Sequence, residues 1–189
     1  MCFVHRRPGS EKGLNHWIGG VMRLDSLQDV FAEQLNDLRS AEAQLVEALP
    51  KMVGAASTDE LRAAFENHLE ETRGHLERIE DLFATGGIAK SGEPCKAMQG
   101  LIEEGEEIIK ADGDPLAKDA ALIAAAQRVE HYEIAAYGTA VTLADHLDLG
   151  DAKDTLGQTL DEEGAADKLL TKIATGGIFS EGVNQRAAR

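Results

Sequence analysis

Four long segments of this chain repeat apolar residues with the period of an amphipathic α-helix, and this pattern constrains the fold more than any other feature. It predicts helices over residues 25–54, 58–84, 115–148 and 151–175. A shorter helix is predicted after Pro94 in "EPCKAMQGLIEEGEEIIKADG". Because the chain is rich in Ala, Leu, Glu and Asp and only 4% aromatic, helices are favoured over strands. We therefore expect an all-α protein.

The order of these segments predicts two antiparallel helical hairpins, joined by a long connection that holds the short helix. A four-helix bundle with a long crossover between its second and third helices has the ferritin-like topology. We divide the chain into a flexible N-terminal extension over residues 1–22, which is Gly-rich and aperiodic, a bundle domain over residues 23–178 and a loose C-terminal tail over residues 179–189.

The ends of the first two helices carry residues that suit caps. Asp25 or Ser26 precedes the first helix and Thr58 precedes the second, and their side-chain oxygens can accept from free backbone N–H groups. Gly86 and Gly87 follow the second helix, where glycine commonly ends a helix. These positions set the expected limits of the first hairpin.

The formal net charge of −15 argues against nucleic-acid and membrane partners, because it repels phosphate groups, and favours cations as small partners. Only Cys2 and Cys95 are present, without a CxxC pair, so no disulfide framework and no rubredoxin or zinc module is indicated. The sequence contains no apolar run of about 18 residues, and its first part lacks the apolar region of a signal peptide. We expect a soluble, cytoplasmic protein.

Acidic side chains fall within the apolar stripes of all four long segments when each residue advances by about 100°. The second segment adds two histidines, and the distances from the hairpin turns place the acids at similar heights along the bundle. The candidate metal ligands are Glu42, His68, Glu71, His75, Glu130, Glu133, Glu163 and Asp167. Of these, Glu71 lies at the edge of its stripe.

Burying several carboxylates without cations would cost many kcal/mol. The stripes contain no Lys or Arg, apart from Arg78 near the edge of the second stripe. Two divalent cations would neutralise most of this charge, and carboxylate oxygens with one or two imidazoles suit iron or manganese. Glutamates contributed by all four helices are how ferritin-like dimetal sites are built. The sequence therefore predicts a site for two iron or manganese ions.

Structural interpretations of the same residues stay open. A single inward Glu is more often a snorkelling or water-bonded side chain than a ligand, and either histidine alone could be a satisfied core residue. Convergence of acids from four helices favours the metal site. Tyr137, one turn beyond Glu133, could contact a ligand or take part in redox chemistry, and core packing is the alternative.

Five stretches of the chain closely resemble the YciE/YciF family of bacterial ferritin-like proteins over about residues 24–178. They are "AEAQLVEALPKM", "HLEETRGHLERIEDLF", "CKAMQGLIEEGEEI", "DAALIAAAQRVEHYEIAAYGTA" and "LDEEGAADKLL". The resemblance implies a ferritin-like bundle, often dimeric, that is associated with bacterial stress responses. It also implies a ligand set of Glu42, Glu71 with a neighbouring histidine, Glu130, Glu133 and Glu163.

The Glu-x-x-Glu pair at 130 and 133 is similar to rubrerythrin-type sites. Helix 151–175 departs from the broader Glu-x-x-His pattern, because it offers Glu163 with Asp167. Spacing does not choose between His68 and His75, and we favour His75 slightly for its direction. The cysteine pairs of a full rubrerythrin are missing, so electrons would have to come from an external donor.

These observations predict a dimetal carboxylate protein that performs redox chemistry with O₂ or peroxide in a bacterial stress response, as a homodimer. Glu71 and Glu130 or Glu133 would bridge the metals, and Glu42, Glu163 and a histidine would hold them terminally. If it is an enzyme, it is an oxidoreductase of rubrerythrin-like or peroxidase/catalase-like type. The alternative is a non-catalytic, stress-associated bundle that binds a protein partner or passively holds metal.

Overall fold

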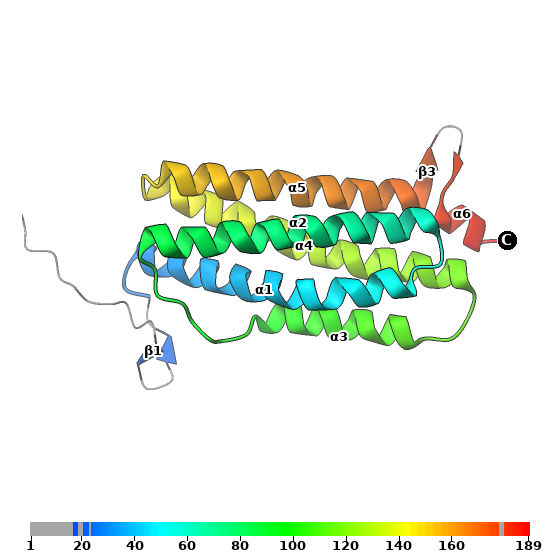
Figure 1. The fold of residues 1–189 in the computed structure, drawn as a ribbon, viewed down its shortest axis with the longest axis horizontal. Coiled ribbons are helices and arrows are strands. Elements are labelled where there is room, and N and C mark those ends of the chain that lie inside the picture. The colour runs from blue at the N-terminus through cyan, green and yellow to red at the C-terminus, as the bar shows by residue number, and fades with distance from the viewer. Residues whose placement is uncertain (1–16, 19–20, 23, 178–179) are drawn as a thin grey trace, which may run out of the picture.

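The computed structural model is a bundle of long helices and describes residues 17–18, 21–22, 24–177 and 180–189 (Figure 1). Its helices are α1 (Leu27–Ala55), α2 (Asp59–Gly86), α3 (Lys96–Lys110), α4 (Pro115–His146), α5 (Gly150–Thr175) and α6 (Val183–Ala187). Two antiparallel pairs of very short strands are also present, β1 (Trp17–Ile18) with β2 (Val21–Met22) and β3 (Gly176–Gly177) with β4 (Ser180–Glu181). None of the described helices is long and apolar enough to cross a membrane.

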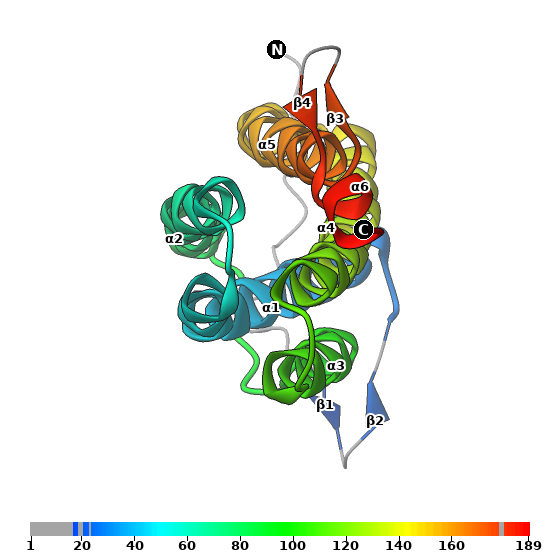
Figure 2. The same cartoon turned by 90° about the vertical axis from the view of Figure 1, so that its right-hand side faces the viewer.

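The four long helices form two antiparallel hairpins that pack side by side. Hairpin α1–α2 contacts hairpin α4–α5 through the pairs α1 with α4 and α2 with α5. The connection from α2 returns along the bundle, and its helix α3 lies on the outside against α1 and α4 (Figure 2). The predicted all-α, ferritin-like four-helix bundle with a short helix in the crossover is confirmed.

Three ends of the long helices carry the capping residues that the chemistry favours. Ser26 caps α1, and its hydroxyl oxygen accepts from the backbone N–H of Asp29 at 3.2 Å. Asp114 caps α4, which has Pro115 in its first turn. Helix α2 ends at Gly87, whose φ of 61° lies in the left-handed region that favours glycine. The predicted limits of the long helices are therefore correct to within two residues.

Thr58 stands at the N-cap of α2, as predicted, but its side chain does not cap the helix. Its hydroxyl instead donates to Asp119 Oδ2 of α4 at 2.8 Å. The backbone N–H groups of Ser57 and Thr58 donate to the same carboxylate at 2.8 and 2.9 Å. Asp119 is fully buried, so this one carboxylate ties the α1–α2 turn to the second hairpin.

The apolar core consists of two clusters along the bundle. One contains Leu45, Leu69 and Leu122, and the other contains Leu35 and Phe83. Between them, the helices place buried glutamates and histidines at one level. The core of this small bundle is therefore interrupted by a polar layer, and that layer holds the candidate site.

The C-terminal segment differs from the loose tail that we expected. Strand β4 pairs with β3, α6 follows it, and Val183 is 1% exposed and packs in the first apolar cluster. Gly176 allows the tight turn, because its φ is 76° and a Cβ there would lie 2.3 Å from the carbonyl oxygen of Ser180. Of the extension over residues 1–22, most lies outside the described residues.

The Asp119 contact generates a stability prediction. Asp119→Ala should lower the free energy of unfolding by about 3 kcal/mol, because three donors of the α1–α2 turn lose their acceptor in a buried place. Urea denaturation of the metal-free protein measures the change. Asp114→Ala removes an exposed helix cap instead and should cost about 1 kcal/mol. Equal losses for the two variants would contradict the role of Asp119.

Candidate metal centre

The polar layer gathers six side chains from the four long helices, and each is at most 7% exposed. Helix α1 supplies one carboxylate, α2 two imidazoles, α4 two carboxylates and α5 one carboxylate. They are Glu42, His68, His75, Glu130, Glu133 and Glu163. The helical period explains why α2 and α4 supply two residues each, because residues three or seven apart lie on the same face of a helix.

Ligand atoms of these residues form two overlapping clusters. His68, Glu130, Glu133 and Glu163 offer atoms within 4.8 Å of one another, and so do Glu42, His75 and Glu163. Both clusters therefore include Glu163, and the rings of the two histidines are 6.4 Å apart.

The two oxygens of Glu163 face different clusters. Its Oε2 atom lies 3.8 Å from His68 Nε2, and its Oε1 atom lies 2.9 Å from His75 Nδ1. The sequence predicted Glu163 as a terminal ligand, with the bridging role on Glu71 and on Glu130 or Glu133. In the structure, Glu163 is the residue that belongs to both clusters, because its side chain extends between the two histidines of α2.

Many polar atoms of the layer are buried without a hydrogen-bond partner among the described residues. Both carboxylate oxygens of Glu133 and Glu163, Oε2 of Glu42 and Oε2 of Glu130 are in this state. The same holds for the histidine nitrogens that face them, His68 Nε2 and His75 Nδ1, although His75 Nδ1 and Glu163 Oε1 are close enough to count as an ion pair. Buried polar atoms without partners are costly, so a native site of this kind calls for ligands from outside the chain. Oxygen and imidazole donors facing one another fit metal cations.

Burial raises the pKa of the carboxyl groups. The pKa of Glu133 is well above its usual range, because the side chain is desolvated and faces the charges of Glu163, Glu42 and Glu130. Burial raises the pKa of Glu130 to about 8, although the charge of His68 opposes the shift. The pKa of Glu42 is raised by burial in the same way, although the nearby imidazole of His75 opposes the shift.

The pKa values of the two histidines are also raised, but here the carboxylates cause the shift and burial opposes it. Burial alone would lower the pKa of His68, but the charge of Glu130, the hydrogen bond with Glu71 and the charge of Glu163 raise it to about 9. Burial also opposes the charged form of His75, and contacts with Glu163 and Glu42 raise its pKa to about 10. Without cations, the layer therefore holds protons in their place.

Tyr137 contacts the site through its hydroxyl, which donates to Glu42 Oε1 at 2.5 Å. The side chain is fully buried, and burial together with the charge of Glu42 keeps its pKa well above the usual range. Tyr137 therefore does two things that the sequence presented as alternatives: it packs in the second apolar cluster and its hydroxyl contacts a candidate ligand.

Glu162 supports the site from outside it, and the sequence interpretation missed this residue. Its Oε2 atom lies 2.9 Å from His75 Nε2, and Arg78 donates to both of its oxygens. Burial alone would raise the pKa of Glu162, but hydrogen bonds from Arg78, Gln158 and His75 lower it to about 2. An ionised Glu162 holds the proton of His75 on Nε2 and leaves Nδ1 to face Glu163. Arg78, three residues after His75, was the signal available in the sequence.

Two of the eight candidate ligands lie outside the clusters. Glu71 has a side chain 48% exposed, and its Oε2 atom reaches only to 3.5 Å from His68 Nδ1. Asp167 has a side chain 22% exposed, accepts from Gln127 at 2.9 Å and lies 3.4 Å from His131 Nε2. A full helical turn separates Asp167 from Glu163, and its shorter side chain stays with these surface partners. Both histidines left open by the sequence are in the layer, one in each cluster.

Comparisons with known proteins agree with the fold. A family model described as a domain of unknown function (DUF892) matches residues 26–188. Protein YciF of Escherichia coli K12 is 45% identical over 165 residues, which cover 87% of this chain and 99% of that protein. The crystal structure of the E. coli stress protein YciF gives a TM-score of 0.77 at 47% identity and covers 79% of this chain and 94% of that one. YcfI of Rhodopseudomonas palustris gives 0.76 at 39% identity, with 79% and 96% covered.

The raised pKa values predict how pH changes the stability of the metal-free protein. Folded Glu130 keeps a proton up to about pH 8, which the unfolded chain releases near 4.5, so stability falls as pH rises through this interval. Folded His68 keeps its proton up to about pH 9 against 6.5 when unfolded, so the slope has the same sign. The melting temperature in chelator should therefore fall between about pH 5 and pH 9.

Mn²⁺ should reverse this trend, because a cation takes the place of the protons and binds better as they leave. Thermal unfolding with and without Mn²⁺ measures the difference in melting temperature, which should grow with pH. Glu130→Gln, which cannot titrate, should flatten the curve of the metal-free protein. A melting temperature of the wild type that rises with pH in chelator would contradict this account.

Proposed function

This chain belongs to the DUF892 family and is similar to the stress protein YciF over most of its length, and we propose that it is a dimetal carboxylate protein with redox activity toward O₂ or peroxide. One observation carries the proposal. Carboxylates and imidazoles from four helices converge in two clusters, and Glu163 belongs to both. Most of the oxygen and nitrogen atoms that face one another there have no hydrogen-bond partner among the described residues.

The charges of the layer match two divalent cations. Glu42, Glu130, Glu133 and Glu163 carry four negative charges when ionised, and two neutral histidines add none. Two dications would bring this sum to zero, which a buried site requires. A single dication would leave two negative charges in the interior. The charge balance therefore supports two ions, and the hard oxygen donors support iron or manganese.

We assign His68, Glu130 and Glu133 to one ion and Glu42 and His75 to the other. Glu163 would serve both ions in this assignment, because each of its oxygens faces one histidine. Glu71 lies at the surface beside His68 and is not required as a ligand. The ligand set uses every long helix, so binding also fastens the two hairpins together.

The protein environment fixes these ligands in place and controls their protons. Tyr137 holds Glu42 through its hydroxyl, and Glu162 with Arg78 holds His75. Such outer contacts orient ligands and set which ring nitrogen is free. An iron or manganese pair held here would supply electrons to an oxidant such as O₂ or peroxide. The apolar clusters pack on both sides of the layer along the bundle and limit its contact with bulk water.

Repeated turnover would need electrons from an external donor, because the chain has only two cysteines and no CxxC pair for an additional redox centre. We propose that the donor is another protein. We also propose that the protein works in the cytoplasm as a homodimer and in a bacterial stress response. The stress role is supported by the similarity to YciF, which is called a stress protein.

Metal analysis tests the ligand assignment. Protein loaded with iron or manganese and freed of excess metal should contain about two ions per chain by mass spectrometry. Glu163→Gln should reduce this to fewer than about one, because the shared carboxylate serves both ions. Asp167→Asn, one turn away on the same helix, should keep the wild-type content. Fewer than one ion per chain in the wild type, or full loading of Glu163→Gln, would contradict the assignment.

Reactivity separates a redox protein from a passive metal store or a protein-binding bundle. The iron-loaded wild type should be oxidised by O₂ or peroxide, and Glu133→Gln should slow the reaction at least about tenfold per bound ion, because this carboxylate has both oxygens directed into the site. Stopped-flow absorbance measures the rate, and Asp167→Asn is again the control. A loaded wild type that reacts with neither oxidant would favour the non-catalytic alternative.

A further inference from the structure

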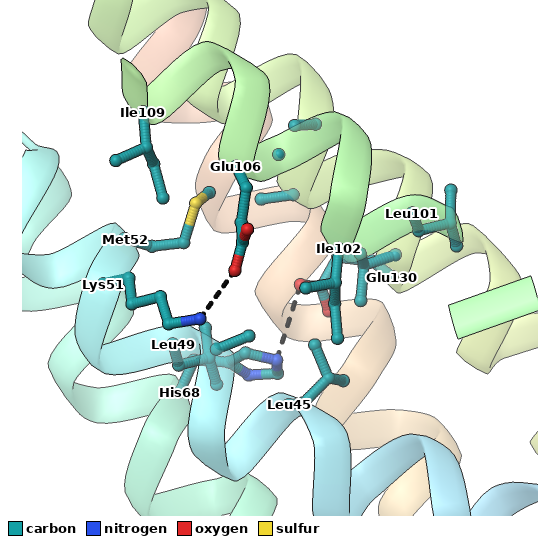
Figure 3. Close-up of a pocket in the computed structure, with 15 residues that line it drawn as sticks. Leu45, Leu49, Lys51, Met52, His68, Leu101, Ile102, Glu106, Ile109 and Glu130 are labelled. Carbon is teal, nitrogen blue, oxygen red and sulfur yellow. Dashed lines mark hydrogen bonds and ion pairs between the residues drawn. The ribbon is translucent and has the colours of Figure 1, made fainter. Parts of the chain in front are cut away.

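We propose that an apolar cavity between α1, α3 and α4 is the path by which dioxygen reaches the buried cluster, an inference that rests on the proposed function. The cavity has a volume of about 40 Å³, and its lining includes Leu45, Leu49, Met52, Ile102 and Val129. His68 and Glu130 also line it, so the cavity adjoins one of the two clusters directly (Figure 3).

The chemistry of the walls selects the molecule. A small apolar cavity stays dry and accepts uncharged gases, because it offers water too few polar partners. Hydrogen peroxide would have to give up its hydrogen bonds with water to enter, which is costly. The volume is sufficient for a molecule of a few heavy atoms and too small for a folded peptide or a nucleotide. Dioxygen is the redox partner that fits both the size and the polarity.

Where α1 meets α3, the lining of the cavity includes an ion pair. Lys51 Nζ lies 2.6 Å from Glu106 Oε1, and their side chains are 55% and 33% exposed (Figure 3). Lys110 lies 3.3 Å from the other oxygen of Glu106. Exposed ion pairs contribute little free energy, so breaking this pair costs little. Helix α3, which lies outside the four-helix bundle, thus provides the outer wall of the path.

A second, larger cavity reaches the same cluster. It has a volume of about 150 Å³, lies between α2 and α5, and includes Asn67, the exposed carboxylate of Glu71, His68 and Glu130 in its lining. Most of this lining is apolar, and the carboxylate of Glu71 and the amide of Asn67 add hydrogen-bonding groups that a hydrated cation or peroxide can contact. Helix α3 lines the first cavity and not the second, so filling the first cavity from α3 should leave metal loading unchanged.

Gly105 offers a way to close the apolar cavity without touching the candidate ligands. It is buried, lines the cavity, and a Cβ added there would meet no atom within 4 Å. The side chain of Gly105→Leu therefore has room to grow into the cavity. Gly100→Leu is the matched control, because Gly100 lies on the same helix, is exposed and is equally free of neighbours. Both changes replace glycine by a better helix former.

Xenon binding to the metal-free protein is the first measurement, because it does not depend on activity. Xenon under pressure should occupy the cavity in crystals of the wild type and of Gly100→Leu, and should be absent from Gly105→Leu. Gly105→Ala, which adds one methyl group, should reduce xenon occupancy without threatening the fold. An empty cavity in the wild type would overturn the inference.

Oxidation of the iron-loaded proteins is the second measurement. Two ferrous ions and two protons reduce one O₂ to one H₂O₂ and leave two ferric ions, and the rate constant for O₂ should fall at least about tenfold in Gly105→Leu. With H₂O₂ as the oxidant, which takes two electrons and two protons to form two waters, the wild type and both leucine variants should react alike. Iron content should be the same in all three proteins.

The outcomes separate this inference from the proposed function. A wild type that reacts with O₂ at the same rate as Gly105→Leu would overturn the apolar path and leave the dimetal assignment in place. An equal slowing with O₂ and H₂O₂ would also overturn it, because both oxidants would then use one route. A loaded wild type that reacts with neither oxidant would overturn the proposed function, and the path for dioxygen with it.

Discussion

Four carboxylates buried in one layer of a helical bundle, most of their oxygens without partners among the described residues, are the constraint on which the rest of the structure depends. The layer divides the apolar core into two clusters, so apolar packing between the helices is not continuous along the bundle. Such an interruption is costly unless something neutralises the charge. Protons do so in the metal-free protein, and two dications would do so while satisfying the facing oxygen and nitrogen atoms.

The surroundings of the layer are organised around this need. Tyr137 and Glu162 fix one carboxylate and one imidazole. Asp119 joins the two hairpins at the N-terminal end of α2, the helix that supplies both histidines. The crossover helix α3 does not supply ligands, yet it forms the wall of the apolar cavity that reaches Glu130. Fold and candidate chemistry are thus connected, because the elements that hold the ligands also control what can approach them.

Helical periodicity was sufficient for much of this structure. It predicted the long helices, the crossover and the inward direction of Glu42, Glu130, Glu133 and Glu163, since direction on a helix follows from spacing alone. It could not predict how far a side chain reaches or which neighbour it meets. The contacts of Asp167 with Gln127 and of Thr58 with Asp119, and the surface position of Glu71, were therefore not predicted.

The shared position of Glu163 and the support from Glu162 depend on distances between helices, which no local pattern contains. The structure of the C-terminal segment rests on glycine turns and on the burial of Val183, too short a signal for periodicity to detect.

The central claim is that two metal ions replace the protons of the buried layer, and anomalous diffraction from crystals loaded with manganese or iron tests it most directly. The account predicts two anomalous peaks inside the bundle, one beside His68 and Glu130 and one beside His75 and Glu42, with Glu163 in contact with both. Peaks confined to surface carboxylates, or a single peak that leaves Glu163 without a metal contact, would contradict it.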